Sequence, residues 1–367
     1  MAFTVFDDGR VVFRYENIPD TPPFEVEIRC PLAASLHQKH EQILEQHRAW
    51  ARDFEVLPNS ERYQRYCDTR FDLLAAYQYH GLPLEAAVTA AHLMTWFFVY
   101  DDVMDIKLAA EREIREYRSR LCSRHMEILS GAAPQQGDPR IVHAFADYLR
   151  RVRQTAHGPL FPWYERMAHH LREYVTGACW ESVIGPTTAA NSNTAMYLQV
   201  RHMSVGVAPC LDLMAAAKRI PSEPVASSFF IQRLERLAIN FSIWINDLAG
   251  LGRDTRRGLG NVIFTLQQDH ALSLKEAAQM VGRMCNGELE AFLTVEKQLP
   301  RLAGAEYERN RTAYDSYTDV LKRWMRGLLD WSVRSPRYQR LDVDMALQND
   351  SLIRQASKTA RSGEGST

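Results

Sequence analysis

The spacing of hydrophobic residues changes after about the first thirty positions. Residues 1–30 contain short alternating segments and the proline-rich stretch PDTPPF, which predict an extended N-terminal arm. From Ala33 onward, stretches such as SLHQKHEQILEQHRAWARDF place apolar residues at helical intervals among Ala, Leu, Glu, Gln and Arg. The pattern therefore predicts helices along almost all of the remaining chain.

Gly and Pro, together with helix-capping residues, interrupt this helical pattern. Asn59 or Ser60 is suited to begin one helix, and Ser273 is suited to cap the helix LKEAAQMV. The interruptions divide the chain into about ten to twelve helices of ordinary length. The breaks read LPNSER, GLPLE, SGAAPQQGDPR, IGPTTAANSN, KRIPSEP and RDTRRGLGN.

No internal repeat or linker interrupts the helical region, which predicts an all-α fold with the helices packed around a common core. We expect an N-terminal arm over residues 1–30 and one single-domain helical bundle over residues 31–345. The end of the chain, RSGEGST, is small and polar, so residues 346–367 are expected to form a disordered tail.

Composition excludes several classes of protein. The 367 residues are 46% hydrophobic, and 44 basic side chains balance 45 acidic ones, so no basic footprint indicates nucleic-acid binding. The longest aromatic and apolar cluster, MTWFFVY, is far shorter than the roughly 20 residues of a membrane span. The N-terminus has early acids and no apolar signal region. Six cysteines without a CxxC motif indicate reduced thiols, and we expect a cytoplasmic protein.

The segment AAHLMTWFFVYDDVMD carries the first acidic cluster. Its helical pattern runs into Asp101, Asp102 and Asp105, with Asp101 and Asp105 on one face. The three carboxylates repel one another near the C-terminal end of a helix, where the dipole also disfavours anions. A hard cation such as Mg²⁺ would compensate for this, although a solvated acidic turn is the simpler alternative. Phe97 and Phe98 favour a buried helix whose acids open onto a cavity.

A second polar stripe occurs in FSIWINDLAGLGRDTRRGLGN. Asn246, Gly250 and Asp254 recur every four residues along one face of a helix, where an amide oxygen and a carboxylate can hold a cation. Gly250 would leave room for a water molecule, and Arg253 would donate to a phosphate. The alternative is that Asn246 and Asp247 are ordinary polar residues near a helix end.

Further basic positions suit a diphosphate. Arg201 is an isolated cation in the apolar run MYLQVRHMSVGV, so it needs either a diphosphate or a buried ion pair with a helix acid. Near the end of the helical region, Arg337 and Tyr338 are adjacent donors. Taken alone, this dipeptide indicates little.

In this order and spacing, the four features resemble the motifs of class I terpene synthases of the microbial single-domain kind, from about Pro23 to Tyr338. Residues 101–105 resemble the aspartate-rich Mg²⁺ motif, and residues 246–254 resemble the second motif of Asn, Ser or Thr, and Glu. Arg201 resembles the diphosphate-sensing arginine, and Arg337 with Tyr338 resembles the late Arg-Tyr pair.

The chain departs from the family pattern at two metal positions. Gly250 replaces a Ser or Thr, and Asp254 replaces the Glu. A water could replace the missing hydroxyl, and a small shift could compensate for the shorter carboxylate. Ser204, Val205 and Gly206 align with the segment whose carbonyl assists ionisation in the family, and the sequence does not choose among them.

The resemblance implies a carbon–oxygen lyase: a sesquiterpene cyclase that ionises farnesyl diphosphate around a central apolar cavity, with three Mg²⁺ ions. The usual assembly in the family is a homodimer. The metal ligands implied are Asp101, Asp105, Asn246, Gly250 and Asp254; the diphosphate donors are Arg201, Arg253, Arg337 and Tyr338; and the residues facing the carbocation are Phe97, Phe98 and Trp331.

Other functions stay open at this point. Geranylgeranyl diphosphate would make the chain a diterpene synthase. A chain-elongating prenyltransferase would need a second DDxxD and more basic residues near the first, where Lys107 stands alone. A non-enzymatic helical adaptor would leave both clusters solvated. A di-iron bundle is excluded because no His follows a Glu by three positions. For the cyclase, we expect Asp102→Asn to matter less than Asp101→Asn, because Asp102 points off the shared face.

Overall fold

Helices dominate the structure, and the predicted all-α fold is confirmed. The computed structural model describes residues 2–56, 60–104, 112–155, 158–188 and 193–339. The helices are α1 (His40–Asp53), α2 (Ser60–Thr69), α3 (Phe71–Gln78), α4 (Leu84–Met104), α5 (Arg112–Leu129), α6 (Arg140–Thr155), α7 (Phe161–Thr188), α8 (Thr194–Ser204), α9 (Val207–Ala217), α10 (Ser222–Ser227), α11 (Phe229–Arg257), α12 (Val262–His270), α13 (Leu274–Ala303), α14 (Ala305–Arg334) and α15 (Pro336–Gln339), with the 3-10 turn η1 (Gly158–Leu160) before α7.

Local sequence signals mark the helix ends. Ser273 begins α13 with a capping box, in which its side chain accepts from the backbone of Glu276 while the Glu276 carboxylate accepts from Ser273. Gly258, in the left-handed region at φ 59°, ends α11. The N-cap predicted at Ser273 is therefore confirmed. Asn59, the other predicted start signal, lies outside the described residues, and α2 begins at Ser60.

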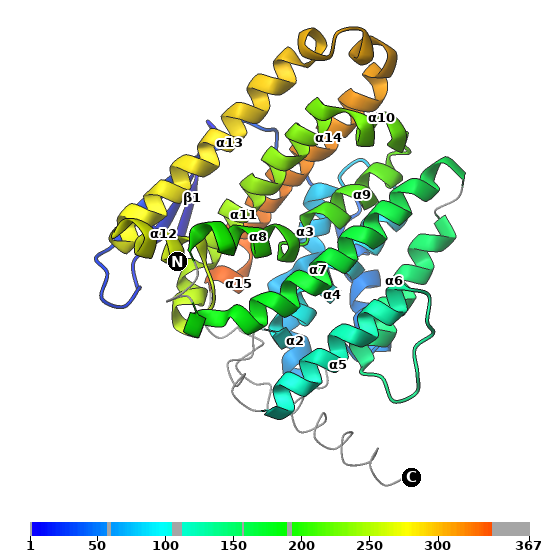
Figure 1. The fold of residues 1–367 in the computed structure, drawn as a ribbon, viewed down its shortest axis with the longest axis horizontal. Coiled ribbons are helices and arrows are strands. Elements are labelled where there is room, and N and C mark those ends of the chain that lie inside the picture. The colour runs from blue at the N-terminus through cyan, green and yellow to red at the C-terminus, as the bar shows by residue number, and fades with distance from the viewer. Residues whose placement is uncertain (1, 57–59, 105–111, 156–157, 189–192, 340–367) are drawn as a thin grey trace.

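The first thirty residues form a small sheet rather than an isolated extended arm. Strands β1 (Ala2–Val5), β2 (Arg10–Tyr15) and β3 (Phe24–Arg29) pair in antiparallel order. In this register Phe13 faces Val26 across the β2–β3 pair. The sheet lies behind α13 in Figure 1, and the Asn286 side chain of α13 donates to Glu27 O and accepts from Arg29 N. The sheet thus belongs to the helical domain's surface.

Long helices run side by side around the interior (Figure 1). Helix α11 packs against α13 and α14, α7 packs against α8 and α9, and α3 joins α14 to α4. The hydrophobic core is continuous through these helices and reaches the sheet. The bundle therefore supports α4 and α11 from several sides, and these two helices carry the two acidic motifs.

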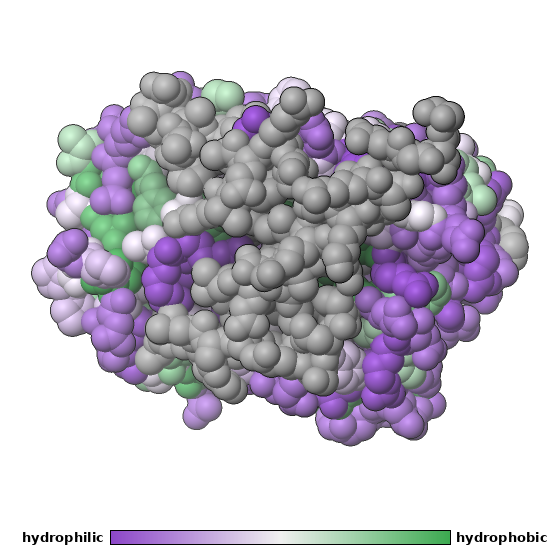
Figure 2. Space-filling view, turned by 90° about the horizontal axis from the view of Figure 1, so that it is seen from below, coloured by the Kyte–Doolittle hydropathy of each residue, from purple (hydrophilic) through white to green (hydrophobic). Residues whose placement is uncertain are grey.

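One face of the molecule is shown in Figure 2. Figure 2 shows the face seen from below Figure 1, where the visible described residues are predominantly hydrophilic, with smaller apolar areas. Among the described residues, no helix combines the length and the apolar character of a membrane span.

Candidate active site

A cavity of about 970 Å³ lies between the motif helices. Along α4, the lining begins with Met94 and continues through two aromatic residues to Asp101. Along α11, Ser242 precedes Asn246 by one turn. Both helices therefore contribute motif residues to the lining, and α4 adds apolar and aromatic side chains.

Asp101 is the acid of the first motif that lines the cavity. Tyr174, from α7, donates its hydroxyl hydrogen to Asp101 Oδ1. Burial, reinforced by the neighbouring Asp101 carboxylate, raises the pKa of Tyr174 well above its ordinary value, so the phenol stays a donor. Asp105, the other expected ligand of this motif, lies outside the described residues.

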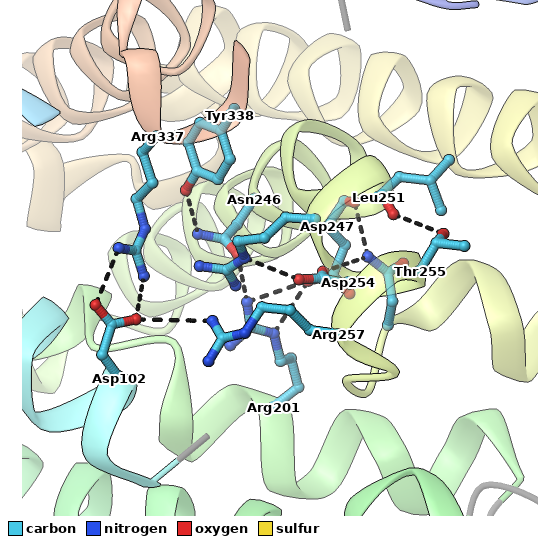
Figure 3. A network of polar contacts seen from close by, with 12 residues as sticks. Asp102, Arg201, Asn246, Asp247, Leu251, Asp254, Thr255, Arg257, Arg337 and Tyr338 are labelled. Atoms are coloured by element: carbon cyan, nitrogen blue, oxygen red, sulfur yellow. Dashed lines mark hydrogen bonds and ion pairs between the residues drawn. The ribbon is translucent and has the colours of Figure 1, made fainter. Parts of the chain in front are cut away.

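Asp102 is not among the described residues that line the cavity, and it forms buried ion pairs (Figure 3). Arg337 Nη2 lies 3.0 Å from Asp102 Oδ1, and Arg257 Nη1 lies 3.8 Å from the same oxygen. Burial alone would raise the pKa of Asp102, but Arg337 and Arg257 outweigh it and the net pKa is lowered. Asp102 therefore remains a carboxylate that holds Arg337 at the cavity wall.

The second motif forms a network with Arg201 (Figure 3). Arg201 Nη2 donates to Asn246 Oδ1 at 2.7 Å, and Arg201 Nε donates to Asp247 Oδ1 at 3.2 Å. Tyr197 donates to Asp247 Oδ2 at 2.8 Å, while Asn246 Nδ2 lies 3.4 Å from the Tyr338 hydroxyl. Arg201 thus makes a buried ion pair with a helix acid and also lines the cavity. The ion pair, one of the two alternatives that the sequence left open for Arg201, is therefore present, and a contact with diphosphate stays a prediction.

Gly250 and Asp254 are in contact on α11. A Cβ atom at Gly250 would lie 2.7 Å from Asp254 Oδ2. The carboxylate therefore fills the space in which the sequence suggested a water molecule. Asn261 donates to Asp254 Oδ2 at 2.9 Å, and Arg253 Nε donates to Asp254 Oδ1 at 3.1 Å. Arg253 and Asp254 line the cavity.

Aromatic side chains form two layers on the α4 side of the cavity. Phe97 and Phe98 belong to the lining, as the sequence suggested. Trp331, expected on the opposite wall, is not among the described lining residues, because it packs behind Phe98 with ring centroids 5.3 Å apart. Its indole donates to Arg70 O at 2.9 Å. The Arg337 guanidinium lies 4.8 Å from the Phe98 ring centroid.

The break between α8 and α9 borders the cavity. Ser204, Val205 and Gly206 all line it. Gly206 adopts φ 68°, and a Cβ there would lie 3.3 Å from the Phe97 ring, so both backbone and space favour glycine. The Ser204 hydroxyl is buried, with no hydrogen-bond partner among the described residues. Three members of this turn thus face the same volume as the two motifs.

The oxygen donors around the cavity suit magnesium better than a transition metal. Asp101, Asn246 and Asp254 offer carboxylate and amide oxygens, and a carboxylate retains further lone pairs when it accepts one hydrogen bond. Within the described ranges, no three His, Cys, Asp or Glu side chains cluster as a metal site. A set with few protein ligands fits Mg²⁺, which characteristically keeps waters and substrate phosphates as its other ligands.

Several residues of the site were not identified from the sequence. Tyr174 and Tyr197 each orient an acid, but a single tyrosine in a helix carries no spacing signal. Asp102 and Arg257 meet only through the tertiary fold. Asn261 was not singled out either, although its place after the GLG break and before an apolar run is a signal for a helix start.

Solved structures of terpene synthases share this fold. The linalool/nerolidol synthase of Streptomyces clavuligerus superimposes with a TM-score of 0.70 at 22% identity, covering 83% of this chain and 99% of that one. The germacradien-4-ol synthase of Streptomyces citricolor gives 0.73 at 20% identity, covering 84% and 98%. The fold is therefore that of class I terpene synthases.

Sequence comparison extends the match from fold to family. The profile described as "Terpene synthase family 2, C-terminal metal binding" matches residues 92–291, more than half of the chain. The (+)-T-muurolol synthase of Roseiflexus castenholzii is 30% identical over 292 residues, covering 79% of this chain and 86% of that protein. The pentalenene synthase of Streptomyces exfoliatus is 29% identical over 335 residues, covering 89% and 95%. The chain belongs to terpene synthase family 2 and is a terpene cyclase of the lyase class.

Proposed function

We propose that the protein is a Mg²⁺-dependent sesquiterpene cyclase that takes farnesyl diphosphate and releases diphosphate. The observation that carries this proposal is the placement of Asp101 on α4 and Asn246 on α11 at the rim of one cavity with an aromatic wall. The relatives support the choice of substrate: the muurolol synthase is named for cyclising (2E,6E)-farnesyl diphosphate.

The polar end of the cavity would hold the diphosphate and its metal ions. Asp101 on one wall and Asn246 with Asp254 on the other would hold Mg²⁺, with Asp105 as a further ligand of the first motif. Bound Mg²⁺, for which the family resemblance implies three ions, neutralises charge on the departing diphosphate. Gly250 supplies no side-chain ligand itself.

The cationic side chains of the chain would receive the leaving group. Arg201, Arg253, Arg337 and Tyr338 all line the cavity. A guanidinium can donate two parallel hydrogen bonds to a phosphate. Asp247 keeps Arg201 in place, and Asp102 keeps Arg337 in place. Because these donors are fixed before substrate binds, little reorganisation accompanies ionisation of the C–O bond.

The apolar depth of the cavity would protect the allylic cation. Phe97 and Phe98 present aromatic rings to this volume, and a good cation–π contact contributes about 0.5–2 kcal/mol. Leu74, Met94 and Leu328 add apolar side chains to the lining. Exclusion of water prolongs the life of the cation until ring closure. Trp331 would act indirectly, by supporting Phe98.

The direct test is product analysis with substrates of three lengths. Purified full-length protein with Mg²⁺ is incubated separately with C10, C15 and C20 prenyl diphosphates, and extracts are examined by gas chromatography–mass spectrometry. We expect cyclic C15 products from farnesyl diphosphate and none in EDTA. Product from the C20 substrate alone would instead identify a diterpene synthase, and no product from any substrate would overturn the enzymatic proposal. A homodimer stays a prediction, to be checked by light scattering.

A further inference from the structure

The two departures from the family's second metal motif touch each other. Gly250 and Asp254 stand one helical turn apart on α11. A Cβ at Gly250 would lie 2.7 Å from Asp254 Oδ2 and 3.4 Å from Asp254 Cγ, and the first distance is too short for a real contact. The carboxylate of Asp254 therefore lies in the volume that a serine or threonine side chain at position 250 would need.

Asn261 holds the carboxylate in this position. Its Nδ2 donates to Asp254 Oδ2 at 2.9 Å and to the Asp247 backbone carbonyl at 2.8 Å. Its Oδ1 accepts from Ile263 N at 3.0 Å and caps α12. The residue is only 1% exposed, so these bonds are shielded from water. Figure 3 shows Asp254 beside Asp247 and opposite Arg201.

We propose that Gly250 and Asp254 form a matched pair, in which Asp254, positioned over Gly250 by Asn261, supplies the metal-facing oxygen that the family's Ser or Thr hydroxyl supplies elsewhere. The proposal rests on the proposed function. Its physical basis is reach: Asp is one methylene shorter than Glu, so its carboxylate stays close to its own helix and can cover position 250. The carboxylate has about four acceptor sites, so the Asn261 and Arg253 bonds leave lone pairs for a cation.

A water molecule over Gly250 would behave differently from this matched pair. If water filled the gap, Gly250→Ser would restore the family ligand and strengthen Mg²⁺ binding. If Asp254 fills it, the serine side chain displaces the carboxylate and weakens binding. Gly250→Ser with Asp254→Glu should then recover binding, because the longer side chain can reach past the serine.

The test measures Mg²⁺ binding without turnover. The melting temperature is measured against Mg²⁺ concentration in saturating inorganic diphosphate. The proteins compared are the wild type, Gly250→Ser, Asp254→Glu and the variant that carries both substitutions. We expect each single variant to need at least about tenfold more Mg²⁺ for the half-maximal shift, or about 1.4 kcal/mol, and the double variant to return to within about threefold. Equal or tighter binding by Gly250→Ser alone would overturn the proposal.

The positioning role of Asn261 needs separate variants, because Asn261 also caps a helix. Asn261→Ser keeps a capping hydroxyl but is too short to reach Asp254. We expect its melting temperature without ligand to fall, because the buried Asp247 carbonyl also loses its donor, and its Mg²⁺ requirement to rise as in Gly250→Ser. Asn193→Ser, at the cap of α8, is the matched control and should change neither value.

These outcomes separate the inference from the proposed function. An unchanged Mg²⁺ requirement in Asn261→Ser would refute the positioning role. A wild-type protein whose melting temperature does not respond to Mg²⁺ and diphosphate would instead refute the diphosphate site itself. The terpene-cyclase activity of the wild type is measured in the same preparation, so failure of the inference can be distinguished from failure of the proposed function.

A second inference concerns two thiols that the proposed mechanism does not use. Cys122 on α5 and Cys179 on α7 hydrogen-bond through their side chains, and Cys179 lines the cavity. The Cys122 Sγ also lies 4.0 Å from Val175 O, one turn before Cys179 on α7. Both thiols are partly exposed, whereas the other four are buried: Cys30, Cys67, Cys210 and Cys285.

The surroundings favour a reactive thiolate at Cys179. The hydrogen bond from Cys122 lowers the pKa of Cys179, and nearby Arg118 lowers it further against the opposing effect of burial. By contrast, burial raises the pKa of Cys285 well above its ordinary value, although Cys30 lies near it. Among the described cysteine pairs, therefore, only Cys122 and Cys179 combine two neighbouring thiols with a thiol whose pKa is lowered.

We infer that Cys122 and Cys179 are a site of reversible two-electron oxidation by peroxide. The Cys179 thiolate attacks the O–O bond and becomes a sulfenic acid as hydroxide leaves and is protonated. The Cys122 thiol then attacks that sulfur and releases water, so two thiols and one hydrogen peroxide give one disulfide and two waters. The new bond would join α5 to α7 one turn from Tyr174, the partner of Asp101.

Peptide mass spectrometry after peroxide treatment of the full-length protein tests this inference. We expect a Cys122–Cys179 disulfide that dithiothreitol reverses, with a several-fold loss of turnover that recovers in parallel. Cys122→Ser should leave Cys179 as an over-oxidised or trapped sulfenic acid, and Cys67→Ser should behave like the wild type. Equal oxidation of Cys30 and Cys285, or failure of Cys122 and Cys179 to cross-link, would overturn it.

Discussion

Asp102 Oδ1 lies 3.0 Å from Arg337 Nη2, which joins the end of α4 to a residue 235 positions later in the chain. Asp102 is not among the described residues that line the cavity, but Arg337, which it holds, does line it. The second Asp of the DDxxD sequence therefore contributes through an arginine. This relationship changes the expectation that its substitution is mild.

Asp102→Asn should destabilise the protein and slow catalysis. The substitution leaves Arg337 and Arg257 buried without their shared counter-charge, and removing one partner of a buried ion pair lowers the free energy of unfolding by on the order of 3 kcal/mol. Urea unfolding measures the loss, and KM for the prenyl diphosphate should rise. Asp53→Asn, an exposed acid at the end of α1, is the control. Wild-type stability in Asp102→Asn would show that the pair adds nothing.

Asp101→Asn and Asn246→Ala should lower turnover strongly while the fold stays intact. Each removes one proposed metal ligand from opposite walls of the cavity, and the loss of a group that stabilises the developing charge reduces kcat by about 10²–10³-fold. Steady-state turnover at saturating Mg²⁺, with circular dichroism as the check on folding, measures both effects. Unchanged turnover in both variants would contradict the metal roles.

Phe98 and Trp331 should respond differently to substitution because they occupy different layers. Phe98→Leu removes an aromatic face from the cavity and should redistribute products and lower kcat by about 2–30-fold. Trp331→Phe keeps the packing but removes the indole bond to Arg70 O, which lowers stability by about 1 kcal/mol. Product profiles and unfolding curves separate the two. A product change in Trp331→Phe as large as that in Phe98→Leu would place Trp331 in contact with the cation.

Buried histidines should lower the free energy of unfolding as the pH falls below 6.5, which is well above the pKa of ordinary carboxylates. Burial lowers the pKa of His92 from 6.5 to about 3 and the pKa of His125 to about 4. Below pH 6.5 these histidines bind protons in the unfolded chain but stay neutral in the folded chain. Each group then removes about 1.4 kcal/mol per pH unit until its folded pKa is reached.

His92→Phe isolates one of these contributions. The ring stacks on Trp50 with centroids 4.3 Å apart, and neither ring nitrogen has a hydrogen-bond partner among the described residues. We expect the slope of unfolding free energy between pH 5 and 6.5 to fall by about one proton. An unaltered slope in His92→Phe would mean that His92 is protonated in the folded protein.

The sequence predicts the helical class and the two motifs because both depend on local periodicity. Asn246 and Asp254 lie on one face of a helix because they are spaced by multiples of four residues. Ser273 marks a helix start because Glu276 follows it by three residues. The same reasoning cannot place Trp331 behind Phe98, because the depth of a side chain depends on neighbours from α3 and α15. It also cannot show that Asp254 covers Gly250, because that contact depends on the length of the Asp254 side chain and on its hydrogen bond from Asn261.

The N-terminal strands illustrate the same limit. Alternation in residues 1–30 suggests extended backbone, but pairing into a sheet requires partners that only the tertiary structure defines. The contact between the sheet and α13 includes hydrogen bonds of Asn286, which no local pattern marks.

One bond from this sheet reaches the catalytic helix itself. Tyr15 donates its hydroxyl hydrogen to the carbonyl oxygen of Leu248 at 2.8 Å, within the segment that carries Asn246 and Asp254. A shortened chain beginning at residue 31 would keep every motif and yet lose this brace on the outer side of α11. Truncation at that boundary, which the motifs alone would suggest, would therefore loosen the part of α11 that carries Asn246 and Asp254, the proposed metal ligands.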